Sequence, residues 1–422
     1  MARKIRLLTL LLALSTALQL IAQDAGRYDS LVNDNNEFAF KFFRQSLAQT
    51  SESNVLVAPT ALSADFAFLQ NGAESKTRAE ILETFDLKNL SADEINQQSF
   101  ALRKALSYLQ APSAKHVPSA RVSKQSPPSM CCSAPAEQLI LAGSLWAQPF
   151  VAFQPEFLAT GKRFYSFHAT SVTGRGPDAV KAVNAWSAQQ TGGKLSHILD
   201  SWQRDDFLLV DTTWFKGAWF NHFWPTKTHP GDFTLLSGQK KEVPMMENGG
   251  GFRYLRGDKF QAIRLPYHRA AMYVFLPDED SSLKTFEQSL TADNWTAWIS
   301  SFNFRDGYLE LPRFHSEYRG DVSAILEDLG IKRAFTTNSS FAPAVSNPEG
   351  ARLTRVLQIV LLTVDEKGTE VVSGGISGGV IGGVSSEPRP EPFRMIVNRP
   401  FFFAICDDQT QAILYMGAIV EP

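Results

Sequence analysis

The spacing of the hydrophobic residues changes between the first and the later part of the chain. Up to about residue 110, apolar side chains recur at helical intervals in residues 38–47, 61–69 and 78–85. The polar run at residues 91–94 has the pattern of a further helix start, because Ser91 is followed three residues later by Glu94. These patterns predict a helical first part.

After residue 137, short apolar runs bounded by polar residues predict strands that are covered on both faces. Helices followed by strands are typical of an α+β protein with large sheets. The expected strands are residues 139–142, 207–210, two within 261–277 separated by residues 267–269, 353–364, 401–405 and 413–419, and one more helix is expected at 321–329 before Gly330.

The N-terminus has the pattern of a secretory signal peptide. Three basic residues, Arg3, Lys4 and Arg6, precede an apolar run from residue 7 to residue 22. The alternative is a membrane anchor, but the run is shorter than the ~20 residues that span a bilayer. We therefore expect residues 1–22 to be removed, with cleavage after Ala22 or Ala25, and a secreted, extracellular domain at 23–422.

Composition narrows the functional class. The 422 residues are 44% hydrophobic, which suffices for a large core, and no linker divides the chain. The 41 basic and 43 acidic residues nearly cancel, so we expect no nucleic-acid partner, and no membrane partner is expected for the mature domain. The sequence has no metal-ligand spacing and no P-loop. We expect a monomer without metal or cofactor.

Residues 111–136 form a basic insertion rich in proline and serine. Such a composition is typical of an exposed segment without a packed core. Its cations are Lys115, Arg121 and Lys124, and Arg103 and Lys104 precede it. Two interpretations remain open: a solvated basic linker, or a salt-sensitive site for a sulfated polysaccharide.

The three cysteines do not form a disulfide framework. Cys131 and Cys132 are adjacent, so a bridge between them would be strained, and pairing with another molecule stays open. Cys406 lies in an apolar run and is expected to be a buried thiol. Three N-glycosylation sequons are expected on surface loops, at Asn89, Asn294 and Asn338.

Residues 371–383 are unusually rich in glycine and are followed by a proline-rich stretch. Glycine at this density opposes fixed structure, because ordering it costs the most backbone entropy. The segment is therefore expected to be either an exposed bait loop or a flexible linker. It also contains a G-x-S-x-G pattern around Ser377, but no helix pattern follows the serine and the last histidine is His315, so a hydrolase site is excluded.

The chain resembles the serpin family in a series of ordered segments. Residues 364–370, with the sequence VDEKGTE, are similar to the serpin hinge, and residues 397–401, VNRPF, are similar to the signature that follows the reactive loop. The resemblance covers nearly the whole mature chain, through residues 54–59, 215–219, 243–246, 275–277, 311–314 and 329–331.

This resemblance implies a serpin fold, with about nine helices around three β-sheets and an exposed reactive loop at 368–396. It also implies inhibition of a serine protease without any catalytic residue of the inhibitor. The protease cleaves the loop and forms an acyl-enzyme, and the freed loop inserts as a new strand into the main sheet. The implied hinge residues are Glu366, Gly368, Thr369, Val371, Val372 and Ser373.

Strand alternation in the inserted loop would place small or uncharged side chains inward, at Thr369, Val371, Ser373, Gly375, Ser377 and Gly379. Two counts locate the scissile bond differently. Counting forward from Glu366 gives Gly382–Gly383, with Ile381 and Val384 beside it, whereas counting back from Asn398 gives Arg389–Pro390. The forward count is favoured, because slack before the bond would allow the protease to deacylate first.

Several positions depart from the family pattern. Inhibitory serpins carry small residues where Val371 and Val372 stand, which leaves the speed of insertion open. The polar cluster beneath the main sheet, usually two serines, an asparagine and a histidine, is replaced by Ala58, Ala61, Asp211 and Gln358. Asp211 and Gln358 are expected to hydrogen-bond to each other.

At the top of the sheet, Glu366 and Arg313 match an ion pair of the family beside Trp219. The alternative to an inhibitor is a non-inhibitory serpin that acts as a carrier, storage or binding protein. The long glycine loop and the bulky hinge residues Val371 and Val372 favour that alternative.

Overall fold

The computed structural model describes residues 28–50, 53–107, 137–173, 176–202, 206–347, 351–369 and 391–422. The expected signal peptide, the basic insertion with Cys131 and Cys132, and the loop from residue 370 to residue 390 lie outside these residues. Within the described ranges, no helix is both long and apolar enough to cross a membrane.

The helices expected in the first part are confirmed. They are α2 (Asp29–Gln49), α3 (Pro59–Leu69), α4 (Ser75–Thr84) and α5 (Ala92–Leu106). α5 begins with the expected capping box, in which Ser91 Oγ accepts from the Glu94 amide and the Glu94 carboxylate accepts from the Ser91 amide. α3 is buried along almost its whole length, because its residues are nearly all small or apolar.

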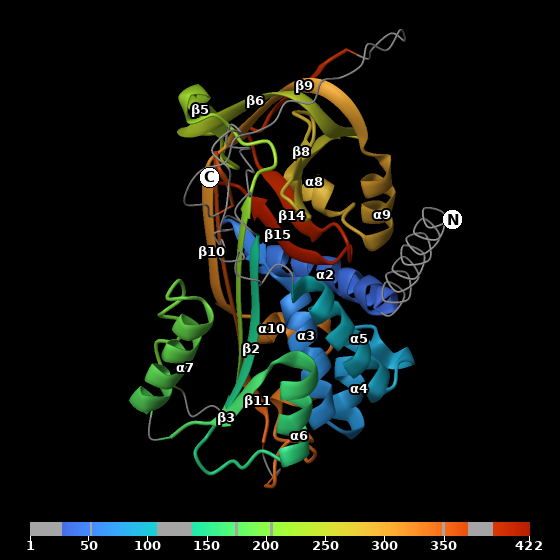
Figure 1. Cartoon of the computed structure of the whole chain (residues 1–422), viewed down its shortest axis with the longest axis vertical. Helices are drawn as coiled ribbons and strands as arrows, with labels where there is room; N and C mark the ends of the chain where they lie inside the picture. Colours follow the sequence, from blue (N-terminus) through green and yellow to red (C-terminus); the bar gives the residue numbers. More distant parts are fainter. Residues whose placement is uncertain are drawn as a thin grey trace, which may run out of the picture.

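The main sheet has six strands in the order β10-β11-β12-β4-β2-β3. Figure 1 shows its long strands running along the molecule, with α2 to α5 gathered at one side. The strand bounds are β2 (Gln138–Ala147), β3 (His168–Ser171), β4 (Phe207–Ala218), β10 (Phe314–Asp321), β11 (Leu353–Asp365) and β12 (Gly368–Thr369).

The second and third expected sheets are continuous in the structure as one nine-stranded sheet. The 18-residue strand β6 (Lys240–Gly257) joins them, because its first part pairs with β5 and its last part pairs with β7. The other strands are β1 (Val55–Val57), β5 (His229–Thr234), β7 (Phe260–Pro266), β8 (Ala270–Pro277), β9 (Asn303–Pro312), β13 (Phe393–Ile396), β14 (Phe401–Asp407) and β15 (Ile413–Ile419).

Together with α6 (Pro155–Thr160), α7 (Gly176–Gln190), α8 (Leu283–Glu287), α9 (Ala292–Ser301) and α10 (Ser323–Leu329), the described part of the chain has nine α-helices. α10 begins two residues after the expected start. Asp321 belongs to the end of β10, and its carboxylate accepts a hydrogen bond from the Ser323 amide. Gly330 ends the helix with φ of 127°, as expected for glycine.

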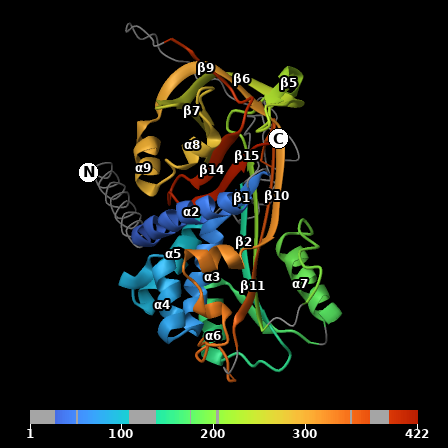
Figure 2. The same ribbon diagram turned by 180° about the vertical axis from the view of Figure 1, so that it is seen from behind.

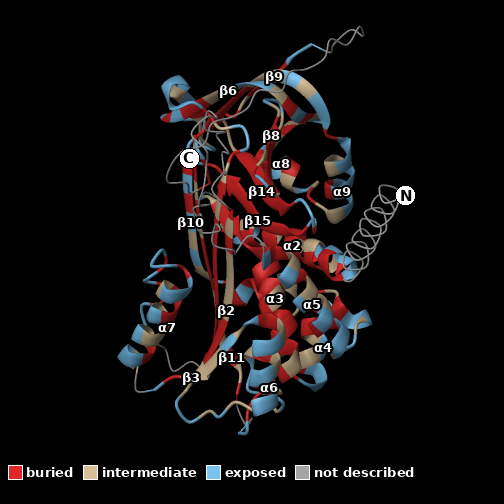
Figure 3. Ribbon diagram, in the orientation of Figure 1, coloured by how far each residue is buried: buried red, intermediate tan, exposed pale blue. Residues whose placement is uncertain are grey.

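The main sheet is covered on both faces (Figure 2). α7 lies on one face and α3 on the other, so β4 is buried on both sides. Leu208 and Val210 pack with α7, whereas Phe207 and Leu209 pack with the large core under the opposite face. Figure 3 shows the buried residues along the sheet strands and α3. The alternation places Asp211 and Gln358 on the α3 face, inside the protein.

An aromatic cluster joins the nine-stranded sheet to α8 and α9. Phe275 of β8 is inaccessible to solvent and lies at its centre. Its ring packs within 6.3 Å of six other aromatic rings, measured between centroids. The partners are Phe260, Phe286, Trp295, Trp298, Phe302 and Phe402. Such a side chain cannot be truncated without leaving a cavity.

We expect Phe275→Ala to lower the free energy of unfolding by about 3–5 kcal/mol, because it loses buried surface and creates a cavity. The matched control is Phe304→Ala on β9, whose side chain is 72% exposed and should change the value by about 0.5 kcal/mol or less. Urea unfolding followed by tryptophan fluorescence measures both. Equal effects of the two variants would contradict the assignment of the core.

Candidate functional site at the seam of the main sheet

The main sheet contains a seam between β11 and β4. These strands pair in parallel from Leu353 opposite Phe207 to Leu361 opposite Trp214. Above that point they separate, and β12 lies between them. β12 pairs antiparallel with both neighbours: Thr369 lies opposite Val364 on one side and Gly217 on the other. The first residues of the expected reactive loop are therefore already a short central strand.

Thr369 points into the protein, as strand alternation predicts. The residue is inaccessible to solvent, and its hydroxyl lies 2.6 Å from the Tyr267 hydroxyl. Tyr267 in turn stacks on Trp219, with 4.6 Å between ring centroids and 11° between the ring planes. The expected position of Trp219 beside the hinge is thus confirmed, while Tyr267 was not identified from the sequence.

Gly368 occupies a position that only glycine fits. Its φ is 149°, in the region that side chains with a Cβ rarely adopt. A Cβ at this residue would lie 2.1 Å from the carbonyl oxygen of Gly217. The close approach of the two backbones is what allows β12 to enter between β4 and β11.

The ion pair expected at the top of the sheet is present. Arg313 donates to the Glu366 carboxylate through Nε, at 2.8 Å, and through Nη2, and Thr228 donates its hydroxyl to the same carboxylate. Burial alone would raise the pKa of Glu366, but the hydrogen bonds from Arg313 and Thr228 lower it below its ordinary value. Glu366 is therefore held as a charged group at neutral pH.

Backbone hydrogen bonds hold the residues on either side of Glu366. Trp219 donates its amide to the Lys367 carbonyl at 3.0 Å and its indole NH to the Asp365 carbonyl at 2.8 Å. The Phe223 amide donates to the Glu366 carbonyl at 2.9 Å. The chain after β11 is thus fixed up to Thr369.

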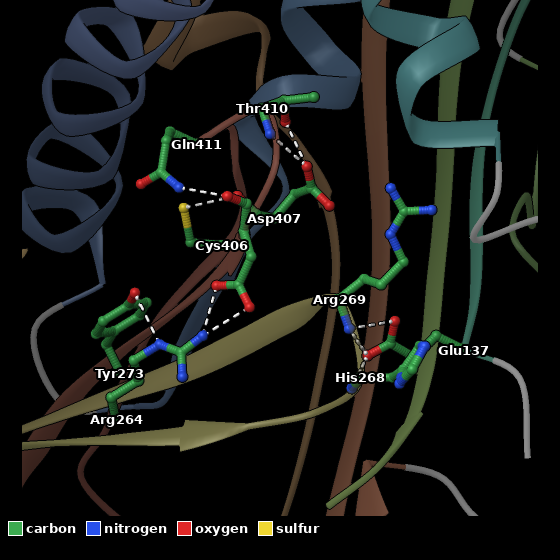
Figure 4. Close-up of polar contacts among 10 residues, drawn as sticks. Glu137, Arg264, His268, Arg269, Tyr273, Cys406, Asp407, Thr410 and Gln411 are labelled. Atoms are coloured by element: carbon green, nitrogen blue, oxygen red, sulfur yellow. Dashed lines mark hydrogen bonds and ion pairs between the residues drawn. The ribbon is translucent and has the colours of Figure 1, made fainter. Parts of the chain in front are cut away.

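Glu137 is a further residue that sequence reasoning missed (Figure 4). It stands directly before β2, and its carboxylate accepts hydrogen bonds from the backbone amides of His268 and Arg269. This is the turn that carries Tyr267. Burial raises the pKa of Glu137, while the hydrogen bonds of the turn oppose that shift. Its only sequence signal is its position as the first acidic residue after the basic insertion.

The other cluster in Figure 4 closes the turn between β14 and β15. Asp407 is inaccessible and accepts from the amide and the hydroxyl of Thr410, at 2.7 and 2.8 Å. Cys406 beside it is a buried free thiol, as expected, and burial raises its pKa. This cluster lies in the nine-stranded sheet, apart from the seam.

Halfway along the seam, Gln358 of β11 binds Asp211 of β4. The Gln358 Nε2 atom donates to Asp211 Oδ2 at 2.7 Å and to the Ala58 carbonyl at 3.2 Å. Its Oε1 atom accepts from the Ala58 amide at 3.2 Å. The expected Asp211–Gln358 hydrogen bond is confirmed, and Ala58 takes part through its backbone. Ala61 is buried in α3 and adds only its methyl group.

Asp65 in α3 also belongs to this region and was not recognised from the sequence. It is buried, and its carboxylate occupies the space beside Gly143 of β2. The signal was available, since Asp65 is the one charged residue in the apolar run 61–69.

Some of the remaining site residues expected from the sequence lie within the described part of the chain, and the others lie outside it. The three sequon asparagines are exposed, but the expected loop position is wrong for Asn294, which lies in the first turn of α9, and Asn89 ends a 3-10 helix. Arg103 of α5 donates to the Phe164 carbonyl and the Ser166 hydroxyl, and Lys104 is exposed. Outside the described residues lie Val371, Val372, Ser373, Ile381, Gly382, Gly383, Val384, Arg389, Lys115, Arg121 and Lys124.

The comparisons with known proteins agree with this geometry. Over 392 residues, the chain is 27% identical to alpha-1-antitrypsin of Sus scrofa, covering 92% of this chain and 86% of that protein. It is 28% identical over 405 residues to the leukocyte elastase inhibitor of Bos taurus, covering 92% and 98%.

Among solved structures, the native thermophilic serpin tengpin superposes with a TM-score of 0.79 at 21% identity, covering 93% of this chain and 95% of that one. Human thyroxine-binding globulin in complex with thyroxine superposes with a TM-score of 0.77 at 21% identity, covering 94% of this chain and 99% of that one. These likenesses concern the fold. The family model described as serpin (serine protease inhibitor) matches residues 33–422. With the short strand β12 paired between β4 and β11 and this match over nearly its whole length, the chain belongs to the serpin family.

Proposed function

We propose that the chain is a secreted, monomeric inhibitor that traps a serine protease by loop cleavage and insertion, with no catalytic activity of its own. The observation that carries the proposal is the double pairing of β12. Gly368 and Thr369 already run antiparallel to both β4 and β11, in the direction that an inserting strand must follow. The next residues could extend the same two ladders.

The register of β12 fixes where each following residue would pair. Thr369 lies opposite Gly217 and Val364, so a strand in this register would place Gly375 opposite both Asp211 and Gln358. β4 begins at Phe207, which would lie opposite Gly379. The proposed scissile bond Gly382–Gly383 would follow shortly after, which supports the forward count.

Glycines within this stretch would reduce the driving force. Ordering Gly374, Gly375, Gly378 and Gly379 in a strand would cost about 0.5–1 kcal/mol each relative to alanine. Gly375 has an advantage, however, because it would add no side chain between Asp211 and Gln358. We therefore expect insertion to be favourable but weaker than with alanines.

One observation favours the carrier as a second candidate. A groove of about 420 Å³ lies between α2 and α8. Its wall combines apolar side chains such as Leu47 and Leu283 with the polar ends of Arg44 and Glu287. Burial raises the pKa of Glu287. An amphipathic small molecule would fit this chemistry, and thyroxine-binding globulin shows that the fold can carry one. A carrier would not need the seam to open.

The decisive experiment is to mix the purified protein with a panel of serine proteases. An inhibitor should give a covalent complex that survives SDS. Cleavage of the loop between residues 374 and 383 by a non-target protease should also raise the melting temperature, because the freed strand completes the main sheet. Verified cleavage with an unchanged melting curve, and no complex with any protease, would favour the carrier.

Replacement of Thr369 should separate binding from trapping. Thr369→Arg would put a charge into the buried space beside Tyr267, which costs several kcal/mol. We expect the variant to be cleaved as a substrate without forming the complex. The control Thr369→Val keeps the shape and loses only the hydrogen bond to Tyr267, so it should retain most of the complex. Full complex yield with arginine would contradict the proposed insertion.

Gly368→Ala tests whether the hinge is held in the seam. The added Cβ would collide with the Gly217 carbonyl, so we expect β12 to leave the sheet. Hydrogen exchange of the Lys367 to Thr369 amides should become faster. Gly249→Ala is the control, because its nearest neighbouring atom would lie 3.9 Å away and its φ is ordinary. Unchanged protection in the Gly368 variant would refute the described pairing.

A further inference from the structure

The carboxylate of Asp65 takes the place of a side chain in the main sheet. A Cβ built on Gly143 would lie 1.9 Å from Asp65 Oδ1. Gly143 of β2 can therefore have no side chain, because the carboxylate of α3 occupies that space. Gly143 pairs directly with Asp211 of β4.

Two buried carboxyl groups consequently lie side by side. Cβ atoms of directly opposed residues in an antiparallel pair are ~4.5–5.5 Å apart. The Asp65 carboxylate stands where one of those Cβ atoms would be, and Asp211 supplies the other. Both residues lie on the α3 face of the sheet, and Asp211 is inaccessible to solvent.

No cation neutralises this pair within the described part of the chain. Asp65 Oδ2 and Asp211 Oδ1 are buried and accept no hydrogen bond there. The titratable neighbours are Tyr165 and Arg103, which line the small cavity beside Asp65. The Tyr165 hydroxyl binds Asn96 and the Ala67 carbonyl, and Arg103 binds the Phe164 carbonyl and Ser166. The facing residue of β11 is the neutral Gln358.

We propose that Asp65 and Asp211 form a buried proton-binding site, in which a carboxyl proton bridges α3 and β4 and keeps the main sheet closed. Ionisation of both adjacent carboxyl groups in a dry site is costly, so near neutral pH a proton is the smallest ligand that can satisfy their unpartnered oxygens. The protonated group donates and the other accepts. Where the resemblance to the family implies an asparagine, this chain has the acid Asp211.

The contacts of Asp211 tie β4 both to the strand across the seam and to the helix beneath the sheet. Gln358 joins β11 to Ala58, the residue before α3, and Asp65 belongs to α3 itself. Asp211 therefore has Gln358 as its partner across the seam and Asp65 as its partner in α3, which packs under β2 and β4. A strand that enters between β4 and β11 would move β4 away from β11 by one strand spacing, ~4.8 Å, and break the contact with Gln358. Because Gln358 also holds Ala58 at the start of α3, β4 would have to shift over α3, and that shift would strain the contact between Asp211 and Asp65.

The direction of the pH effect follows from the same burial. Burial raises the pKa of Asp211 to about 7, although the hydrogen bond from Gln358 lowers it. Burial and the neighbouring Asp211 raise the pKa of Asp65 well above its ordinary value. A carboxyl whose pKa is raised on folding stabilises the folded state at low pH, and this contribution is lost as the pH rises through its folded pKa. The closed sheet should therefore weaken as the pH rises from the ordinary aspartate pKa, ~4, through about 7 for Asp211, and further as Asp65 ionises.

This site would regulate the proposed inhibitor, and to that extent it rests on the proposed function. Alkaline conditions leave two negative charges between α3 and β4, and their repulsion favours the shift of β4 over α3 that strand insertion requires. We expect faster strand insertion at pH 8.5 than at pH 6. The proton itself is a separate claim, because it concerns the intact protein without any protease.

Carboxyl titration tests the proton site directly. In the intact protein labelled with ¹³C at the aspartate carboxyl carbons, two coupled resonances should titrate near neutral pH, far above exposed aspartates. Their assignment follows from Asp65→Asn and Asp211→Asn. If all aspartates whose signals are resolved, including these two, titrate below pH 5, the proposal is wrong. This measurement does not depend on loop insertion.

Stability and strand annealing test the consequence. The melting temperature of the wild type should fall by about 2–4 °C between pH 6 and 8.5 relative to the double variant Asp65→Asn/Asp211→Asn. A peptide with the sequence of residues 369–379 should anneal to the wild type several-fold faster at pH 8.5, and to the double variant at one rate. Asp407→Asn, which removes a buried acid of the β14–β15 turn that is bound by Thr410, should keep the wild-type annealing profile.

The outcomes separate the two claims. A double variant with the wild-type pH profile would overturn the proton site. A melting temperature that changes when sodium is replaced by choline, with no pH dependence, would mean that a cation occupies the site instead. Coupled carboxyl titration without any peptide annealing would support the proton site and refute the proposed insertion mechanism.

Discussion

The structure depends on the parallel pairing of β4 and β11, which is complete over most of its length and open at one end. Because β4 and β11 pair directly with each other, a new strand can enter between them only where the two strands have already separated. Gly368 and Thr369 occupy that opening and prevent the two strands from closing above Trp214. Glu366, Arg313 and Trp219 then hold the chain at the entrance.

Much of this organisation can be predicted from the sequence, because local patterns determine it. Helical spacing predicts α2 to α5, continuous apolar runs predict β4 and β11, and the hinge sequence indicates where β12 belongs. The Asp211–Gln358 hydrogen bond is also predictable, since both residues occupy positions of one family cluster. The continuity of the second and third sheets through β6 is not, because a bend within one strand leaves no clear pattern.

The residues that sequence reasoning missed act through contacts between distant segments. Tyr267 reaches Thr369 across 102 positions, and Glu137 reaches the Tyr267 turn across 131. Neither belongs to a short motif, so only the folded chain shows their roles. Asp65 is different: a charged residue in an apolar helix does signal a special environment, but its neighbour is identified only by the missing side chain of Gly143.

The contact between Gln358 and Ala58 has a consequence for how the two sheets are joined. The side-chain amide of Gln358 offers the same NH and carbonyl pair as a peptide group, and it bonds both backbone groups of Ala58. Ala58 follows β1, the edge strand of the nine-stranded sheet. One glutamine therefore imitates a single residue of a neighbouring strand. The side chain of Gln358 therefore links the six-stranded and the nine-stranded sheet through two hydrogen bonds of the kind that join adjacent β-strands.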